Sequence, residues 1–540
     1  MASTRQVITE LKWPGAPMPT PKNLTALATR SDGTVEAWGY DARKRWNAAA
    51  IRHSANNINY AHAFKMGLMS EDRAEGIVST VAAYLAKLVE YATERIQASG
   101  YESDEIRWCL TVPAIWTDFQ KQVMRKAAEA AGLPAEKDRL VFALEPEAAA
   151  HYARVSGLRT SGLSGGRASL MSPKSRFMVV DCGGGTIDIT SYRADADNNL
   201  EEIGNDCGGP YGSDYLNRAF VSEVLLSRFC TWARMRELAA DSPAGFSSLV
   251  DGWEREKTQV EFPVAGEIYI PIPAALHRTL TDSDLETLSG HQDGVTDAIV
   301  VSEAETAAIF DRIVSEVLKL VDKQLGEMQL QRRGSKGEEI IVLVGGFGAS
   351  KYLQARLKEH VVGRAKVIIP PDPGAAVLEG AVHYAYDPQI IARKTKLTYG
   401  IDSSREFRPG VDPLSKRFED DRGRAMCNDY FSVFVNAQQI IRVGKCVSHS
   451  FVPLYGNQTK MSIAIHATKK LTPRYVDEDG VSELGKMVVD LSSVMHKRLE
   501  DRSVEVSMFF GETELRVQAL VKDTQESLEA TLELSPQDWE

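Results

Sequence analysis

Residues 177–192 have the sequence FMVVDCGGGTIDITSY, and this stretch decides the fold of the chain. Its apolar residues Phe177 to Val180 predict a short buried strand. Three glycines follow, and apolar alternation resumes at Ile187, so the pattern predicts two strands joined by a glycine-rich hairpin. Because glycine lacks a β-carbon, such a loop can turn tightly and direct its N–H groups at a bound anion. By itself the stretch is as typical of an ordinary glycine-rich turn as of a phosphate-binding loop.

Polar residues bracket the three glycines. Asp181 precedes them, and Thr186 and Asp188 follow them. Two carboxylates at a loop can hold a hydrated divalent cation, and the threonine adds a hydroxyl donor. No Gly-Lys-Ser/Thr follows the glycines, so the stretch is not a strand–loop–helix P-loop.

The composition is that of a globular protein with more than one domain. A chain of 540 residues predicts two to four domains, and 43% hydrophobic with 25% charged residues is ordinary for globular folds. The formal net charge of -11 and the lack of a long basic run argue against nucleic-acid binding. No apolar run reaches the ~18 residues that a bilayer requires, and no signal-peptide core opens the sequence. The six cysteines lack metal-ligand spacing. We therefore expect reduced thiols, no membrane contact and a cytoplasmic or nuclear protein.

A second motif couples a strand to an acid. Residues 140–144 predict a strand that leads directly into Glu145-Pro146 and an alanine-rich helix over 147–153. An acid at the carboxyl end of a strand, just before a helix, is where α/β folds place their chemistry. A solvated surface glutamate is the alternative. His151, on the same helix, is interpreted as a packing or surface residue.

Two further glycine-rich turns follow. Gly208-Gly209 opens a turn that enters a helix near Leu216. Residues 340–344 predict the clearest buried strand of the chain, and it leads into GGFGAS over 345–350 and then a helix. Such glycines allow a flat ligand to lie against the backbone, and a helix N-terminus favours a negative group. Tight packing alone is the alternative.

The pattern changes along the chain in two places. Residues 156–175 are rich in Ser, Gly and Arg and predict a flexible loop between two lobes. After Pro388 helical periodicity gives way to alternating strands, which predict a β-sandwich of about 140 residues. The predicted strands are 431–435, 440–443, 461–465, 487–491, 504–510 and 515–521.

Five segments, in this order, resemble the actin-fold ATPases and most closely the heat shock protein 70 family. They are Cys109–Ala114, Leu144–Ala150, Asp181–Asp188, Val344–Gly348 and Asp372–Ala381. Trp38-Gly39-Tyr40 and Phe64–Leu68 are closer to the divergent 12-type branch of that family.

The resemblance implies an α/β, two-lobed actin-like (ribonuclease H-like) ATPase domain over 1–388. Lobe I would comprise about 1–170 with 367–388, and lobe II about 171–366. A linker over 389–398 and a β-rich, β-sandwich-like domain over 399–540 would follow, in the position of the family's substrate-binding part.

The resemblance also implies roles for single residues. Asp181 would hold Mg²⁺ or the attacking water, Glu145 would order that water, and Thr186 would contact the γ-phosphate. Asp188 would hold the hydrated Mg²⁺, and Lys65 would contact phosphate. The remaining residues implied to bind ATP or ADP are Gly183, Gly184, Gly185, Gly208, Gly209, Lys257, Gly345, Gly346 and Ser350.

The sequence departs from the family pattern in two places. Thr258 stands where the family usually has an arginine that stacks on adenine, which a threonine cannot do. Residues 1–12 contain neither Asp nor Gly, whereas the family opens with an Asp-x-Gly-Thr-Thr hairpin that forms its first phosphate loop. We therefore expect impaired hydrolysis and an exposed sheet edge in lobe I, in a chain that is either truncated or a degenerate ATPase.

Three functions remain open at this point. The first is a heat-shock-70-like protein in which ATP biases a β-rich domain that binds unfolded-protein or peptide clients, with a co-chaperone as a further partner. The second is a non-catalytic nucleotide-sensing scaffold, that is, a pseudo-ATPase. The third is a small-molecule kinase of the same fold. Coupling between domains is in question, because the connector offers only Ile390-Ile391 as an apolar dock.

Overall fold

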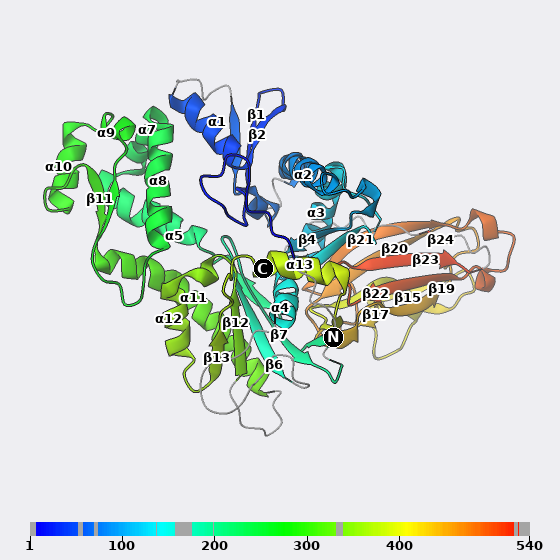
Figure 1. Cartoon of the computed structure of the whole chain (residues 1–540). Helices are drawn as coiled ribbons and strands as arrows, with labels where there is room; N and C mark the ends of the chain where they lie inside the picture. Colours follow the sequence, from blue (N-terminus) through cyan, green and yellow to red (C-terminus); the bar gives the residue numbers. More distant parts are fainter. Residues whose placement is uncertain are drawn as a thin grey trace. The chain divides into compact units, whose positions relative to one another are not determined.

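The computed structural model describes residues 7–51, 58–69, 74–136, 138–156, 175–197, 199–330, 339–522 and 527–528. The protein is α/β with several sheets (Figure 1). It forms two compact units. Unit 1 comprises Met1–Ile115, Val123–Ser191 and Asp206–Pro388, and unit 2 comprises Trp116–Gln122, Tyr192–Asn205 and Gln389–Glu540.

The first part of unit 1 contains two small sheets. An antiparallel sheet has the order β2-β1-β3, and β4 and β5 form a parallel pair. The α1 helix packs on β1, and α13 packs along α4. The elements are β1 (Ala26–Thr29), β2 (Val35–Trp38), α1 (Gly39–Ile51), β3 (Asn59–His62), η2 (Phe64–Met69), α2 (Ala74–Gln97), η4 (Ser103–Glu105), β4 (Trp108–Val112), α3 (Asp118–Ala130), β5 (Leu140–Leu144), α4 (Glu145–Val155) and α13 (Ala376–Tyr386).

A mixed sheet organises the second part of unit 1. Its strands β13, β12 and β6 pair in parallel, β7 comes next in the order, and β9 pairs antiparallel with β7. Because β6 and β12 are parallel, with Asp181 opposite Val344, the loops after both strands emerge at the same edge. The strands are β6 (Arg176–Cys182), β7 (Ile187–Ala194), β9 (Cys207–Gly209), β12 (Glu339–Val344) and β13 (Ala365–Ile368).

Helices surround this sheet and share one hydrophobic core with it, to which Val180, Leu343 and Phe310 belong. They are α5 (Asp214–Ala219), η5 (Phe220–Leu225), α6 (Leu226–Phe229), α7 (Trp232–Asp241), α8 (Pro243–Lys257), α9 (Ala274–His277), α10 (Asp282–His291), α11 (Glu303–Leu330), η6 (Phe347–Ala349) and α12 (Lys351–His360). Between α8 and α11 in the sequence, β10 (Ile268–Pro271) and β11 (Ala298–Val301) form a two-stranded antiparallel sheet.

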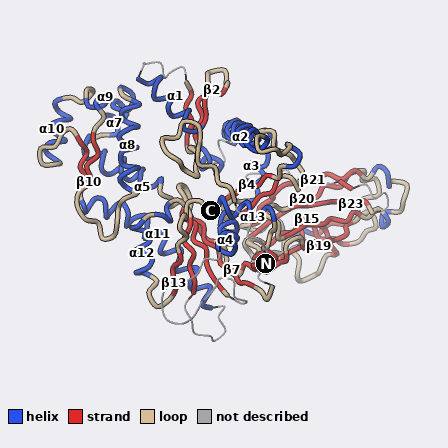
Figure 2. Tube along the Cα trace, viewed as in Figure 1, coloured by secondary structure: helices blue, strands red, loops and turns tan. Residues whose placement is uncertain are grey.

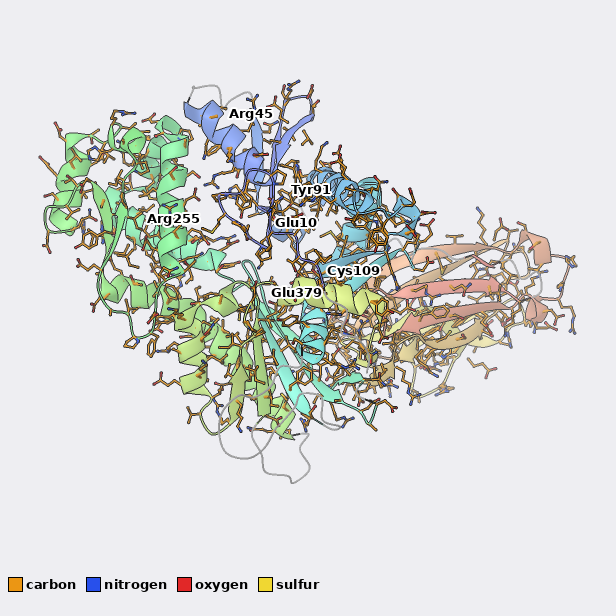
Figure 3. The ribbon with its side chains drawn as sticks, in the orientation of Figure 1. Glu10, Arg45, Tyr91, Cys109, Arg255 and Glu379 are labelled. Atoms are coloured by element: carbon orange, nitrogen blue, oxygen red, sulfur yellow. The ribbon has the colours of Figure 1, made fainter. Side chains whose placement is uncertain are left out.

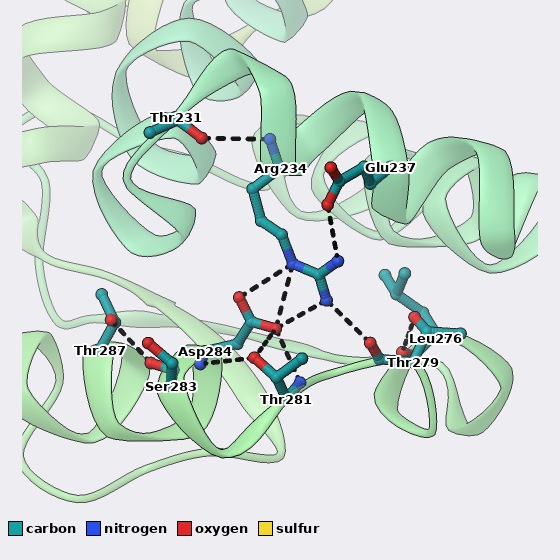
Figure 4. A network of polar contacts seen from close by, with 9 residues as sticks. All are labelled: Thr231, Arg234, Glu237, Leu276, Thr279, Thr281, Ser283, Asp284 and Thr287. Carbon is teal, nitrogen blue, oxygen red and sulfur yellow. Dashed lines mark hydrogen bonds and ion pairs between the residues drawn. The ribbon is translucent and has the colours of Figure 1, made fainter.

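A polar network joins α7 to α10 (Figure 4). Arg234 pairs with the buried Asp284 at 2.7 Å and also donates to the Thr279 carbonyl. Asp284 in turn accepts from the N–H and hydroxyl of Thr281, which caps α10. One carboxylate therefore serves both the helix cap and the link between the two helices.

Unit 2 consists mostly of strands (Figure 2). One sheet has the order β16-β17-β15-β20-β21 and another β19-β22-β23-β24. Strands of both sheets contribute to one hydrophobic core, with Ile463 and Ile465 from β20 and Val506 and Met508 from β22. β14 pairs in parallel with β8 and antiparallel with β18.

The bounds in unit 2 are β8 (Leu200–Glu202), β14 (Ile390–Lys394), β15 (Thr398–Glu406), η7 (Leu414–Lys416), β16 (Arg417–Glu419), β17 (Ala425–Val435), β18 (Ile440–Arg442), β19 (Lys445–Phe451), β20 (Lys460–Thr468), β21 (Val481–Asp490), η8 (Ser492–Val494), η9 (Leu499–Asp501), β22 (Val504–Phe510), β23 (Arg516–Val521) and β24 (Ser527–Leu528).

Strands lie at all six positions predicted after Pro388, but others were missed. β15 and β19 were not expected, and residues 390–394, assigned above to the linker, form β14. β14 is stabilised by pairing with strands that are distant in sequence, and the local sequence pattern does not reveal such partners. Residues 157–174 of the predicted interlobe loop lie outside the described residues. Among the described helices, none is long and apolar enough to cross a membrane.

Candidate active site

The glycine hairpin after β6 is built together with the turn over 212–214. Gly183 N–H donates to the Thr186 carbonyl at 2.9 Å, which closes the hairpin. Asp214 N–H then donates to the Gly184 carbonyl at 2.8 Å. A β-carbon added to Gly212 would lie 2.2 Å from that same carbonyl oxygen, so only glycine fits there. The two glycine-rich turns expected to bind nucleotide are therefore in direct contact.

Asp181 and Asp188 are both buried, at the end of β6 and the start of β7. Burial raises the pKa of each carboxyl, and the nearby Glu145 carboxylate adds to the effect. Asp188 Oδ1 accepts the Ile115 N–H at 3.0 Å, while Asp188 Oδ2 is buried and has no hydrogen-bond partner among the residues that the structure describes. A buried carboxylate oxygen without a partner costs folding free energy unless a water, an ion or a ligand interacts with it.

Lys65 and Glu145 meet at this cluster. Lys65, on η2, places Nζ 2.5 Å from Glu145 Oε1, and Glu145 is the first residue of α4. Burial would lower the pKa of Lys65, but Glu145, Asp188 and Asp181 together raise it. Two elements far apart in sequence thus bring a cation to the carboxylates that β6 and β7 supply.

The loop after β12 contacts the glycine hairpin. Gly345 has a φ of +86°, and a β-carbon on it would lie 2.4 Å from Asp181 Oδ1. Its N–H donates to the Pro373 carbonyl at 2.8 Å. Ser350 is the N-cap of α12, where its side chain accepts the Leu353 N–H. Ser350 therefore caps a helix, and its contact with a nucleotide stays a prediction.

Lys257 and the glycines of β9 brace the second turn. Lys257 is buried, pairs with Glu254 at 2.7 Å and donates to Asn217 Oδ1 at 2.9 Å. Gly208 lies opposite Asp188 in the β7–β9 pair, and a β-carbon on Gly209 would lie 2.4 Å from the Tyr211 ring. These positions require close packing. Their contact with a nucleotide remains a prediction.

Two contributors to the site carry no sequence signal. The backbone N–H of Ile115 holds Asp188, and the Lys22 ammonium lies near Asp181, whose pKa it lowers against the larger effect of burial. Lys22 stands in a proline-rich passage without a motif. Only the fold brings these groups to the carboxylates.

The carboxylates suit a hydrated cation. Within the described ranges, no three His, Cys, Asp or Glu side chains are arranged to hold a bare metal ion. Asp181 and Asp188 supply acceptors, and Asp188 Oδ2 is unused. Mg²⁺ commonly keeps several waters and binds through one or two carboxylates and phosphate oxygens, so these residues fit that ion with a phosphate ligand.

The known proteins that are similar to this chain include heat shock 70 kDa proteins and a DnaK chaperone. No protein-family model matches the chain. Human heat shock 70 kDa protein 12B is 26% identical and covers 95% of this chain and 85% of its own length. Human heat shock 70 kDa protein 12A is 26% identical over 81% of this chain and 71% of its own. The chaperone protein DnaK of Elusimicrobium minutum is 27% identical over 54% of this chain and 42% of its own.

Relatives of this kind imply an actin-like ATPase fold. The 12-type similarity reaches almost the full chain, whereas the DnaK similarity covers about half of it. This protein is therefore a relative of the heat shock protein 70 family.

Proposed function

We propose that the chain is an ATP-binding protein of the heat shock 70 type, which holds ATP or ADP with Mg²⁺ between two lobes of unit 1. One observation carries the proposal. Asp181, Asp188, Glu145 and Lys65 converge where two glycine-rich loops touch. Carboxylates with a lysine beside backbone-lined loops are the groups that Mg²⁺ and a polyphosphate require.

Each residue then has a distinct role. Asp188 and Asp181 would hold the hydrated Mg²⁺ through their carboxylates. Lys65 exchanges its contact with Glu145 for a phosphate oxygen, and Glu145 is then free to orient a water. Thr186 donates its hydroxyl to the terminal phosphate. Bound Mg²⁺ supplies neutralisation of the phosphate charge.

Unit 2 would contain the client-binding part. Its two sheets share one core, which supports a β-sandwich over about 399–528. The similarity to human 12B extends over 95% of the chain and so includes most of this region. An unfolded-protein or peptide client, with a co-chaperone, is the partner class proposed for it.

Binding without turnover is the second candidate function. No Asp-x-Gly-Thr-Thr motif occurs in these 540 residues, which contain the phosphate-loop motif Asp181–Asp188. Phosphoryl transfer depends on positioning and charge stabilisation, and removal of a single preorganised donor typically costs ~100-fold or more in rate. The nucleotide-sensing scaffold therefore stays beside the ATPase.

Titration with a fluorescent ADP analogue, combined with steady-state phosphate release, tests both. We expect the wild type to bind in the presence of Mg²⁺ and Asp188→Asn to lose Mg²⁺-dependent affinity. Asp197→Asn, which changes an exposed carboxylate of the same chain, is the matched control and should bind as the wild type.

Binding with phosphate release supports the ATPase, and binding alone supports the scaffold. A wild type that binds no nucleotide overturns both. Phosphate release that rises only with a small acceptor would instead favour a kinase.

A further inference from the structure

The N-terminal segment over residues 7–25 is anchored to unit 1 at several points. Thr9 Oγ1 donates to Glu379 of α13 at 3.3 Å, and Glu10 pairs with Arg95 of α2 at 2.5 Å. Figure 3 labels Glu10, which belongs to this segment, and Glu379, the residue of α13 that Thr9 contacts. The backbone of the segment is therefore tied to two helices before it reaches β1.

Aromatic packing holds the middle of the segment. The Trp13 ring lies 5.5 Å from that of Tyr91 and meets the Trp38 ring edge-on at 6.3 Å. Tyr91 also donates to the Lys12 carbonyl at 3.1 Å. Such contacts restrict where the next residues can run.

Lys22 is placed at the proposed phosphate site by this anchoring. A β-carbon on Gly346 would lie 3.1 Å from Lys22 Nζ, and one on Gly374 would lie 4.0 Å from Lys22 Cε. The Lys22 charge also reaches the Asp181 carboxylate. The ammonium thus lies over the glycine loop that follows β12, beside the end of β6.

Lys22 differs from the other two lysines of the site, whose ammonium groups form ion pairs. Lys65 is paired with Glu145, and Lys257 is paired with Glu254. Across the ranges that the structure describes, the Lys22 ammonium makes no hydrogen bond or ion pair, and Lys22 is exposed. A lysine held beside backbone glycines, with no partner of its own, is arranged for an anion.

We propose that Lys22 binds the phosphate groups of the nucleotide as a second cation, in addition to Lys65. The inference rests on the proposed function and names a binding residue in it. Three carboxylates, Asp181, Asp188 and Glu145, surround the site. A polyphosphate entering there meets strong repulsion, which one bound Mg²⁺ and one lysine offset only in part. A free second lysine supplies the missing positive charge.

The test compares Lys22→Gln with Lys12→Gln, which removes the same charge from an exposed lysine of the same segment. Affinities for ATP, ADP and adenosine are measured by calorimetry with Mg²⁺ present. A charge-assisted hydrogen bond lost on substitution predicts about a tenfold or larger drop in ATP and ADP affinity for Lys22→Gln. Adenosine affinity should stay within about twofold, Lys12→Gln should bind as the wild type, and Lys22→Arg should restore most of the loss.

Other outcomes overturn the assignment. Unchanged ATP affinity in Lys22→Gln removes Lys22 from the site while leaving the proposed function intact. Equal losses of ATP affinity in Lys22→Gln and Lys12→Gln would show that only the net charge of the protein matters, and would contradict a specific role of Lys22. An equal loss for adenosine and ATP shows that Lys22 does not act on phosphate. A wild type that binds none of the three ligands overturns the proposed function, and the role of Lys22 with it.

Discussion

The ammonium of Lys65 lies 2.5 Å from the carboxylate of Glu145, although 79 residues separate them in the chain. The Lys65 side chain is 39% exposed and that of Glu145 13%, so water reaches the lysine side of this half-buried ion pair. Such partly exposed pairs contribute little to stability, about 1 kcal/mol or less. The pair can therefore be opened at small cost when an anion competes for the lysine.

A double-mutant cycle on this pair tests that interpretation. We expect Lys65→Gln, Glu145→Gln and the double variant to differ from additivity by less than about 1 kcal/mol in the free energy of unfolding without ligand. Urea denaturation monitored by tryptophan fluorescence measures it. A coupling energy of several kcal/mol would mean that the pair is structural and is not released for phosphate.

Asp188→Asn should separate stability from ligand binding. Burial disfavours the charge on Asp188 and raises its pKa, so a neutral amide of the same shape should raise the melting temperature in EDTA at pH 8. The amide oxygen can still accept the Ile115 N–H. Affinity for Mg²⁺ with nucleotide should fall in the same variant. A lower melting temperature in EDTA would contradict the view that this carboxylate is held at an energetic cost.

His151 predicts a pH dependence of stability. It is buried against the Tyr384 ring at 5.4 Å, as a packing residue. Burial, with Arg154 and His383 nearby, lowers the pKa of His151 to about 3. Above the ordinary pKa of 6.5, both the folded and the unfolded states are neutral. As pH falls, the unfolded chain takes up a proton that the folded chain refuses, so stability is lost from pH 6.5 down to about 3.

Between pH 7 and pH 5 this effect amounts to about 2 kcal/mol for the wild type. His151→Gln should lose about that much less stability over the same interval in urea titrations. His496→Gln, at an exposed position, is the control and should retain the wild-type dependence. Parallel slopes for His151→Gln and the wild type would rule out this contribution.

The Arg234–Asp284 network predicts a large local effect. Burial would raise the pKa of Asp284, but Arg234 and Thr281 lower it, so the carboxylate is charged and well partnered. Asp284→Ala removes the buried carboxylate partner of Arg234 and the carboxylate half of the α10 capping box, which should cost about 3 kcal/mol in the free energy of unfolding. Thr287→Ala, on the exposed side of the same helix, should change stability by no more than about 0.5 kcal/mol. Thermal unfolding of the two variants checks the difference, and equal melting temperatures would dismiss the network as a stabilising element.

Much of the fold was accessible to local pattern. The strands predicted over 140–144 and 340–344 end where expected, directly before Glu145 and Gly345. Strong apolar periodicity and glycine-rich turns mark such elements clearly. The short strand β14 was missed, because its stability comes from pairing with β8 and β18.

The sequence alone marked Asp181 to Asp188 and the loop over 345–350 by their glycines, and resemblance to a family added Glu145 and Lys65, which lie far from them in the chain. The roles of Ser350 and Lys257 toward a nucleotide stay predictions; in the structure Ser350 caps α12, and Lys257 donates to the Ser213 carbonyl and to Asn217 of α5. Folding alone decided that Ile115 N–H binds Asp188 and that Lys22 lies over Gly346. Such contacts form where segments distant in sequence meet in space, and the local sequence does not show which segments will meet.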